Sequence, residues 1–263
     1  MNYKGEHSIT FYRVSDPEKV VNTWTDWQLI PVSRPTINPP SVQNFYLTIP
    51  GRSGKIDFTD SILPSPAYDN REGSLDFIVD HDSKDYIRWI ITYNKISEFL
   101  HGQKLRMILS DEPDVYYEGR FSINEFKSNS DWSSIVIDYD VLPYKMSVVS
   151  SLDNWLWNPF NFITGYIRKP EDYKIKINGN QGPVMHTIIN IPGESIVTIE
   201  INPKVLSVVY VFNKLGSMQT YRLSEDTDYK LTFTIYPERP NFYIQALSDF
   251  DIEVYINFTG GRL

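Results

Sequence analysis

Residues 83–126 read SKDYIRWIITYNKISEFLHGQKLRMILSDEPDVYYEGRFSINEF, and a change of hydrophobic period within this stretch decides the fold. In its first part, apolar side chains recur at the three- and four-residue spacing of one helix face. These side chains are Ile87, Ile90, Ile91, Tyr93, Ile96 and Leu100. Asp82 or Ser83 is the expected N-cap, and Gly102 is a helix stop signal. The stretch therefore predicts one long helix.

The second part of the stretch has the two-residue period of β-strands. Residues 104–110 (KLRMILS), the proline turn DEPD and residues 115–126 (VYYEGRFSINEF) predict a β-hairpin. Glu118 and Arg120 share one strand face, so they can pair with each other or with a neighbouring chain. Gly119, on the other face, indicates a bulge or a place where another backbone comes close.

Composition and charge limit the possible functions. The chain has 263 residues, 14% of them aromatic, which fits two folded domains with β structure. Its 33 acidic and 25 basic side chains give a formal net charge of -8, opposite to what binding to nucleic-acid phosphates requires. The absence of cysteine excludes disulfides, thiolate zinc sites and thiol nucleophiles.

Targeting signals are not visible in the sequence. The start, MNYKGEHSITFYRV, lacks an apolar signal-peptide core, and the longest apolar run, VLSVVYVF at 205–212, is too short to span a bilayer. We therefore expect a protein made in the cytoplasm without a signal peptide and without membrane insertion.

The chain divides into two β-rich parts. Short β-like runs separated by proline and glycine precede the helix: SITFYRV at 8–14, WTDWQLIPV at 24–32, VQNFYLTIPG at 42–51 and SLDFIVD at 74–80. SRPTINPPS at 33–41 reads as a loop. Seven strand-like segments without a helix signal occupy 166–263, which predicts a β-sandwich. We expect a first domain at 1–146, a linker at 147–165 and a second domain at 166–263. The fold class is mainly β with one long helix.

A glycine-rich segment, PGRSGKIDFTD at 50–60, resembles a phosphate-binding loop only superficially. That loop needs four residues between its glycines and a Ser or Thr after its lysine. Here two residues separate Gly51 from Gly54, and Ile56 follows Lys55. The segment is expected to be a turn.

Metal ligation and nucleophilic catalysis lack a supporting pattern. Asp80, His81 and Asp82 are adjacent, so on an extended chain they point to opposite faces, and no second ligand cluster accompanies them. The remaining histidines are His7, His101 and His186, which occur singly and are expected to be structural or surface residues. We expect no metal and no cofactor.

The carboxylates of residues 110–123 are the remaining candidates for catalysis. Asp111, Glu112 and Asp114 fall in the predicted turn, where acidic side chains commonly cap backbone groups. Glu118 lies on the strand that follows. A glycosidase would need two carboxylates facing each other across a cleft, and the spacing does not show this. We expect no catalytic residues and no enzyme.

An ordered set of motifs carries a family resemblance. PTINPPSVQNFYLTIPGRSGKIDFTD is followed by AYDNREGSLDFIV, by the helix ending in EFLHGQKLRMILSDEPDVYYEGRF, and by VLPYK. Together they resemble the distal tail protein, often called Dit, of long-tailed bacteriophages (siphophages) and prophages. The match covers about residues 25–146. The second half fits by architecture, because members often carry a C-terminal galectin-like β-sandwich.

The resemblance implies a structural baseplate hub with a role in host attachment. In that family six copies form a ring, built by an N-terminal β-sandwich with a helix-and-hairpin belt. The belt would lie at 83–126 here. A hairpin of this length is marginal alone in water, so a neighbouring subunit is a natural packing partner. The implied partners are the tail tube protein, the tail-tip protein and receptor-binding proteins.

The implied ring would surround DNA without binding it specifically, and an acidic lumen would prevent sticking. The expected subunit-interface and family-motif residues are Gly51, Gly54, Asp57, Tyr68, Arg71, His101, Gly102, Tyr117, Glu118, Gly119, Arg120, Pro143 and Tyr144. The segment WLWNPFNF after Asn154 is expected to be a linker or a docking surface.

Two other functions remain open. A carbohydrate-binding adhesion module could use the second domain, although all six tryptophans lie at or before residue 157, leaving only Tyr and Phe as sugar platforms. A hydrolase acting on cell-wall polymer would depend on Asp114 and Glu118.

Overall fold

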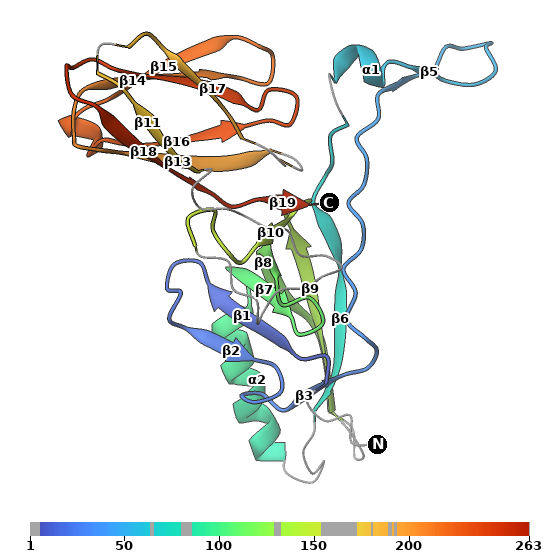
Figure 1. Ribbon diagram of the computed structural model, residues 1–263. Helices are drawn as coiled ribbons and strands as arrows, with labels where there is room; N and C mark the ends of the chain where they lie inside the picture. Colours follow the sequence, from blue (N-terminus) through green and yellow to red (C-terminus); the bar gives the residue numbers. More distant parts are fainter. Residues whose placement is uncertain are drawn as a thin grey trace. The chain divides into compact units, whose positions relative to one another are not determined.

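The structure is a computed structural model that describes residues 6–63, 66–79, 86–128, 133–153, 173–179, 181–188, 191 and 194–262. The chain forms two compact units, Met1–Lys145 and Met146–Leu263 (Figure 1). The expected N-cap at Asp82 or Ser83 and the WLWNPFNF segment lie outside the described residues. The expected fold class, mainly β with one long helix, is confirmed.

The first unit is built on one antiparallel path of seven strands, in the order β2-β1-β7-β8-β9-β6-β3. These strands are β1 (Ile9–Arg13), β2 (Val20–Asn22), β3 (Leu29–Pro31), β6 (Arg71–Val79), β7 (Gln103–Leu109), β8 (Val115–Ser128) and β9 (Ser133–Val141). Strict alternation on β6 and β9 buries one face of the sheet and leaves the other to solvent.

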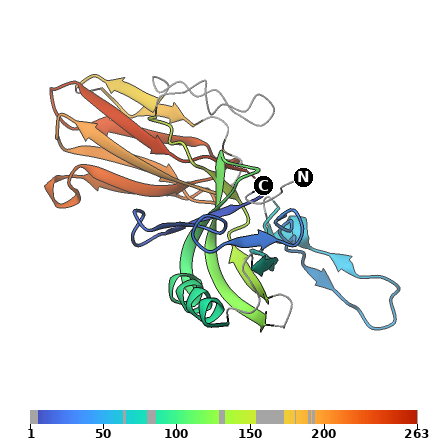
Figure 2. The ribbon, with the colours of Figure 1, turned by 90° about the horizontal axis from the view of Figure 1, so that it is seen from below.

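Helix α2 (Tyr86–Leu100) packs against β7 and β8 on the buried face of this sheet (Figure 2). Its buried stripe contains Trp89, Ile96 and Leu100, at helical spacing, and joins the core around Phe11 and Phe77. Gly102 follows with a φ of 72°, the left-handed conformation that ends helices, so the helix stops where the sequence predicts.

The expected buried face of α2 is only partly correct. Ile87, Ile90 and Ile91 are 72%, 38% and 51% exposed, whereas the structure buries Trp89. The helix is apolar on two stripes, and its own sheet covers only one of them.

The hairpin predicted at 104–126 is present as β7 and β8, but it occupies the middle of the sheet. Strand β7 pairs with β1 on one side and β8 on the other, and β8 also pairs with β9. A register shift between Ile123 and Glu125 marks a bulge in β8. The expectation that the hairpin depends on a neighbouring subunit for its packing is wrong, because both of its edges are filled by the same chain.

Between β3 and β6 the chain forms a two-legged extension, residues 41–69, which we call the arm. It contains β4 (Tyr46–Leu47), β5 (Ile56–Asp57) and the short helix α1 (Thr59–Ile62), and a bridge between Val42 and Tyr68 joins its legs. None of its described residues is buried. The strand expected from residues 42–51 is therefore reduced to two residues in a segment without a core.

The second unit contains two four-stranded sheets, β11-β18-β13-β16 and β12-β17-β14-β15. Its strands are β11 (Lys174–Ile177), β12 (Val184–Thr187), β13 (Ser195–Asn202), β14 (Ser207–Phe212), β15 (Met218–Leu223), β16 (Lys230–Ile235), β17 (Asn241–Ala246) and β18 (Ile252–Phe258), with the 3-10 helix η2 at Glu225–Thr227. The short strands β10 (Lys145–Ser147) and β19 (Gly261–Arg262) pair with each other and belong to neither of these sheets. Inward-facing side chains of both sheets share one core, which confirms the expected β-sandwich.

Strand β15 was not anticipated. Its sequence, MQTYRL, has no strict alternation of apolar and polar residues, and only Leu223 in it is buried. Its place at the sheet edge, paired with β14, depends on that neighbour and not on its own pattern.

Candidate functional site

The expected interface residues lie in three separate places in the first unit. One group surrounds buried Arg71, a second lies along β7 and β8, and the third belongs to the arm. The first two groups make hydrogen bonds and ion pairs within the chain, although His101, Gly102 and Arg120 of the second group are exposed. The third group lies on the arm, where none of the described residues is buried.

Arg71 is 6% exposed and holds three segments together. Its Nε donates to the Pro143 carbonyl oxygen at 2.7 Å, and its Nη1 donates to the Asn38 carbonyl oxygen at 3.1 Å. Its guanidinium also lies 5.9 Å from the centre of the Tyr117 ring, a cation–π distance. Arg71 therefore fixes β6 to three other segments: the loop that carries Asn38, strand β8 and the segment after β9.

Next to this cluster the rings of Tyr68 and Tyr144 meet edge to face, with centroids 6.2 Å apart. This contact ties the base of the arm to the chain that follows β9. The Tyr117 hydroxyl donates to the Glu112 carboxylate at 3.1 Å. Burial, together with this neighbouring negative charge, raises the pKa of Tyr117 well above its usual value.

Gly119 lies between Leu105 of β7 and Val141 of β9 in the strand register. A Cβ at this position would lie 2.1 Å from the Asp140 carbonyl oxygen and 2.5 Å from the Val141 Cα. The expected close approach of another backbone is therefore present, and that backbone is β9 of the same chain.

Glu118 pairs across the strands with two cations of β7. Lys104 Nζ lies 2.7 Å from its carboxylate and Arg106 Nε lies 2.9 Å away. Burial alone would raise the pKa of Glu118, but the hydrogen bonds and charges of these two side chains outweigh it and lower the pKa. The possible pair between Glu118 and Arg120 is not formed.

The two residues that follow α2 are also bound internally. Arg120 Nη1 donates to the Gly102 carbonyl oxygen at 3.0 Å, and the Ile123 amide donates to His101 Nδ1 at 3.1 Å. His101 is thus a structural acceptor, as its isolated position suggested. Both contacts fasten the end of the helix to β8.

The turn carboxylates bind distant segments. Asp111 accepts from His7 Nδ1 at 2.8 Å and from Arg34 Nε at 2.9 Å. Burial opposes ionisation of Asp111, but these two partners outweigh it and lower its pKa. Glu112 pairs with Lys145 at 2.5 Å. These long-range partners were missed, because nothing local in the sequence links Asp111 to His7.

The arm holds the remaining expected residues. Gly51 and Gly54 have φ values of 81° and 79° at its tip, a conformation that favours glycine. Asp57 accepts a hydrogen bond from the Thr59 amide at 2.9 Å, and its hydrogen bonds with Thr59 lower its pKa. The large apolar side chains exposed on the arm are Val42, Phe45, Tyr46, Leu47, Ile49, Phe58 and Ile62.

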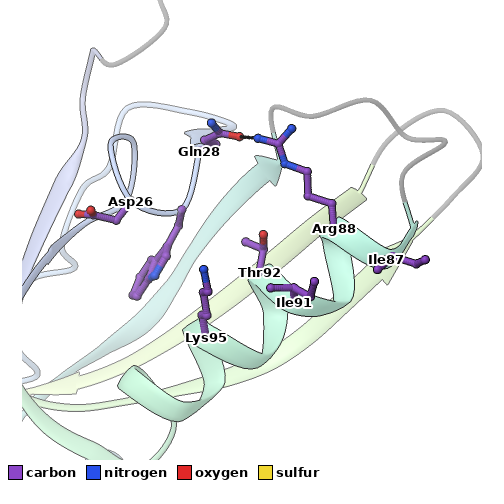
Figure 3. Close-up of a pocket in the computed structure, with 8 residues that line it drawn as sticks. Asp26, Gln28, Ile87, Arg88, Ile91, Thr92 and Lys95 are labelled. Atoms are coloured by element: carbon purple, nitrogen blue, oxygen red, sulfur yellow. Dashed lines mark hydrogen bonds between the residues drawn. The ribbon is translucent and has the colours of Figure 1, made fainter.

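A shallow pocket of about 350 Å³ lies beside the exposed stripe of α2. Figure 3 shows Ile87, Ile91 and Lys95 along the helix, opposite the loop that carries Asp26 and Gln28. The other lining residues are Trp27, Arg88 and Thr92. Arg88 Nη2 donates to Gln28 Oε1 at 2.8 Å, which holds one wall of the pocket.

The outer face of the β12-β17-β14-β15 sheet is aromatic. Tyr210 lies opposite Tyr243 in the strand register, and the Phe212 and Tyr243 rings lie 6.2 Å apart. None of the four strands contains Asp or Glu. On the other sheet, by contrast, exposed Lys176 pairs with Glu253.

Neither a metal site nor a membrane-spanning helix is found among the described residues. No group of three or more His, Asp or Glu side chains there could hold a metal ion. None of the described helices is long and apolar enough to cross a membrane.

The structure thus defines a protein of two β-rich units, with exposed apolar side chains on the arm and on α2 and an aromatic outer face on the second unit. Among solved structures, the chain is similar to SPP1 Dit, described as a paradigm of the hub adsorption apparatus in phages that infect Gram-positive bacteria. The two share 14% sequence identity over 97% of this chain and 99% of that chain, with a TM-score of 0.56. The fold likeness to the distal tail protein expected from the motifs is confirmed.

Two structures of the phage P2 baseplate in its activated conformation, with Ca and with Sr, match at 11% and 10% identity. Each match covers 98% of both chains with a TM-score of 0.37, which adds nothing to the fold assignment. No protein-family model matches the sequence, and no curated protein matches it.

Proposed function

We propose that the chain is a structural hub of a phage tail tip and that six copies of it assemble into a ring, as the resemblance to the distal tail family implies. The ring would join the tail tube protein to the tail-tip protein and hold receptor-binding proteins. The fold shared with SPP1 Dit supports this role. The observation that carries it is the arm.

The arm is rich in exposed apolar side chains, as protein interfaces are, but none of its described residues is buried in a core of its own chain. Seven large apolar side chains are exposed on it, with Tyr46 at 53% and Ile62 at 55%. A two-stranded hairpin without a hydrophobic partner is marginal in water. Contiguous exposed apolar surface of this kind marks a protein interaction site. A neighbouring subunit that covers the arm would remove this surface from water.

We propose that the arm makes the contacts between subunits that the sequence analysis assigned to the belt at 83–126. The β7–β8 hairpin is already paired on both edges, whereas the arm has no cover. The solvent face of β6 and β9 carries Glu72, Asp76, Asp138 and Asp140, and it would suit the lumen of a ring through which DNA passes.

A structural role also explains the acidic side chains of residues 110–123, which were the remaining candidates for catalysis. Asp111, Glu112 and Glu118 each bind a cation of the same chain. We therefore propose that the chain is not an enzyme, since these carboxylates are committed to ion pairs.

The ring can be tested with purified protein by native mass spectrometry and negative-stain imaging. The wild-type chain is expected to form closed rings. Leu47→Ser combined with Ile49→Ser on the arm is expected to leave folded monomers, because the apolar surface that drives association is reduced.

Ile196→Ser, a change at an exposed apolar residue of the second unit, is the matched control and should leave rings intact. Arg120→Glu tests the alternative in which β8 makes the contact. A wild-type chain that stays monomeric at high concentration, or rings unaffected by the arm variant, would contradict the proposal.

The aromatic outer face of the second unit favours carbohydrate binding as a second candidate function. Sugar rings stack on aromatic planes, and Tyr210 and Tyr243 lie side by side on this face. We expect saturable binding of the full chain to wall polysaccharide of a Gram-positive host, weakened about tenfold by Tyr210→Ala or Tyr243→Ala.

Binding can be measured by calorimetry or by sedimentation with purified walls. Tyr255→Ala, on the outer face of the other sheet, is the control and should bind as the wild type does. Equal weakening by all three variants would rule out this face as the binding site.

A further inference from the structure

The aromatic outer face of the second unit also carries a cation. In the sheet β12-β17-β14-β15, side chains that enter the core alternate with side chains that point away from it. Val209 of β14 is in the core and lies opposite Tyr221 of β15, which packs against the same core. The next residue along each strand therefore lies on the outer face, and these residues are Tyr210 and Arg222.

This outer face has an apolar centre with polar side chains around it. In the strand register Tyr243 lies between Met185 and Tyr210, and the ring of Phe212 contacts that of Tyr243. The C–H face of a sugar ring stacks on such aromatic planes, and the polar side chains can bind its hydroxyl groups. Those polar side chains are Thr187, Thr220, Arg222, Asn241 and Gln245.

Arg222 is a group that a neutral sugar does not require. It is the only Lys or Arg in the four strands of this sheet, which contain no Asp or Glu. Arg222 is exposed, and among the described residues it forms no ion pair, although Glu225 and Asp226 follow in η2. On the other sheet, by contrast, Lys176 pairs with Glu253. The charge of Arg222 is therefore available to an anionic ligand.

The position of Arg222 relative to Tyr210 indicates where that anion would lie. Tyr210 is opposite Thr220, and Arg222 is two residues further along β15. Diagonal neighbours of this kind are about 7–8 Å apart, so the long arginine side chain can reach a group attached to a sugar that rests on Tyr210. A guanidinium offers two parallel N–H donors, which match two oxygens of a phosphate.

We infer that this face binds a sugar polymer whose units are joined by phosphodiesters. One sugar rests on Tyr210 and Tyr243, and the phosphate that follows it binds Arg222. The inference rests on the proposed carbohydrate-binding function and names its ligand class.

Two further considerations favour a phosphodiester at this face. The carboxylate of a uronic acid is attached directly to the sugar ring and would lie beside the tyrosines, whereas a phosphate lies beyond the ring, on the side of Arg222. The formal net charge of -8 repels a polyanion from the molecule as a whole. A sheet with one arginine and no carboxylate is a place where such a polymer can approach.

Calorimetry with the full chain and a polymer of hexose units joined by phosphodiesters tests the inference. Arg222→Gln is expected to weaken binding about tenfold, because the charged hydrogen bonds to phosphate are lost. Tyr210→Ala should weaken it by a similar factor. Lys176→Gln is the matched control, since it removes one positive charge from the outer face of the other sheet, and it should bind as the wild type does.

Two simpler polymers separate the sugar from the charge. Dextran, a neutral glucose polymer, should bind about tenfold more weakly than the hexose phosphate polymer, and Arg222→Gln should not change its binding. Polyphosphate, which has no sugar, should also bind at least about tenfold more weakly. Polyphosphate bound as tightly as the hexose phosphate polymer would mean that charge alone is recognised, and the inference would be wrong.

The remaining outcomes distinguish this inference from the function on which it rests. If Arg222→Gln binds the hexose phosphate polymer as the wild type does, the anionic ligand is overturned and sugar binding stands. Polygalacturonate, a uronic acid polymer, bound equally well through Arg222 would overturn the phosphodiester. A wild-type chain that binds neither these polymers nor Gram-positive walls overturns both proposals.

Discussion

Gly119→Ala is expected to destabilise the first unit by about 3 kcal/mol or more, an effect at the upper end for a single methyl group. The added Cβ would lie 2.1 Å from the Asp140 carbonyl oxygen and 2.5 Å from the Val141 Cα. Both are backbone atoms of a central strand, so no side-chain rotation relieves the clash. Strand β9 would have to leave β8, and the sheet would lose its register in the middle.

Urea unfolding, followed by hydrogen exchange of amides in β8 and β9, measures this effect. Gly182→Ala is the matched control, because a Cβ there meets nothing within 4 Å. Gly179→Ala should instead destabilise the second unit, where a Cβ would lie 2.3 Å from the Asp249 carbonyl carbon. If the Gly119→Ala protein were as stable as the Gly182→Ala control, β8 and β9 could move apart to admit a methyl group at little cost, and the expected effect would be wrong.

Arg71→Met is expected to reduce the free energy of unfolding by about 2–3 kcal/mol, because it leaves two carbonyl oxygens without their donor. Those acceptors are Pro143 and Asn38, and methionine fills the side-chain volume without replacing either hydrogen bond. The loss of the cation over the Tyr117 ring adds to the effect. Arg71→Lys should recover little, since an ammonium cannot reproduce the planar fork that serves both acceptors.

The comparison is Arg120→Met, at an exposed arginine with one hydrogen bond to the Gly102 carbonyl oxygen. It should change stability by less than about 1 kcal/mol. Equilibrium urea curves for wild type and the three arginine variants give the measurement. Similar losses for Arg71→Met and Arg120→Met would mean that the buried cluster does not hold β6, β8 and the segment after β9 together.

The sequence predicted the elements where a period is strong and continuous. Alternation in Leu75, Phe77 and Val79 predicted β6, and the change of period after Gly102 separated α2 from β7. Gly119 was expected to mark a bulge or a close approach of another backbone, and the structure shows the close approach. Strand β15 was missed because its sequence does not alternate between apolar and polar residues, and it forms a strand by pairing with β14.

The candidate contacts were predicted less well than the elements. Glu118 was expected to have a charged partner, but the cations proved to be Lys104 and Arg106 across the sheet. Asp111 was read as a turn residue, and it also binds His7, 104 residues away. Such pairs depend on which strands meet, and no spacing in the sequence records that.

The sequence by itself determined the kind of each long element, helix or strand, because side-chain period follows directly from backbone geometry. It also carried the motifs that led to the shared fold. Only the tertiary structure decided that the β7–β8 hairpin is central, that α2 keeps Ile87 and Ile91 exposed, and that the arm has no core. The physical reason is that burial depends on which distant segments close over a surface, and an apolar stripe has the same sequence whether its cover is the same chain or another copy.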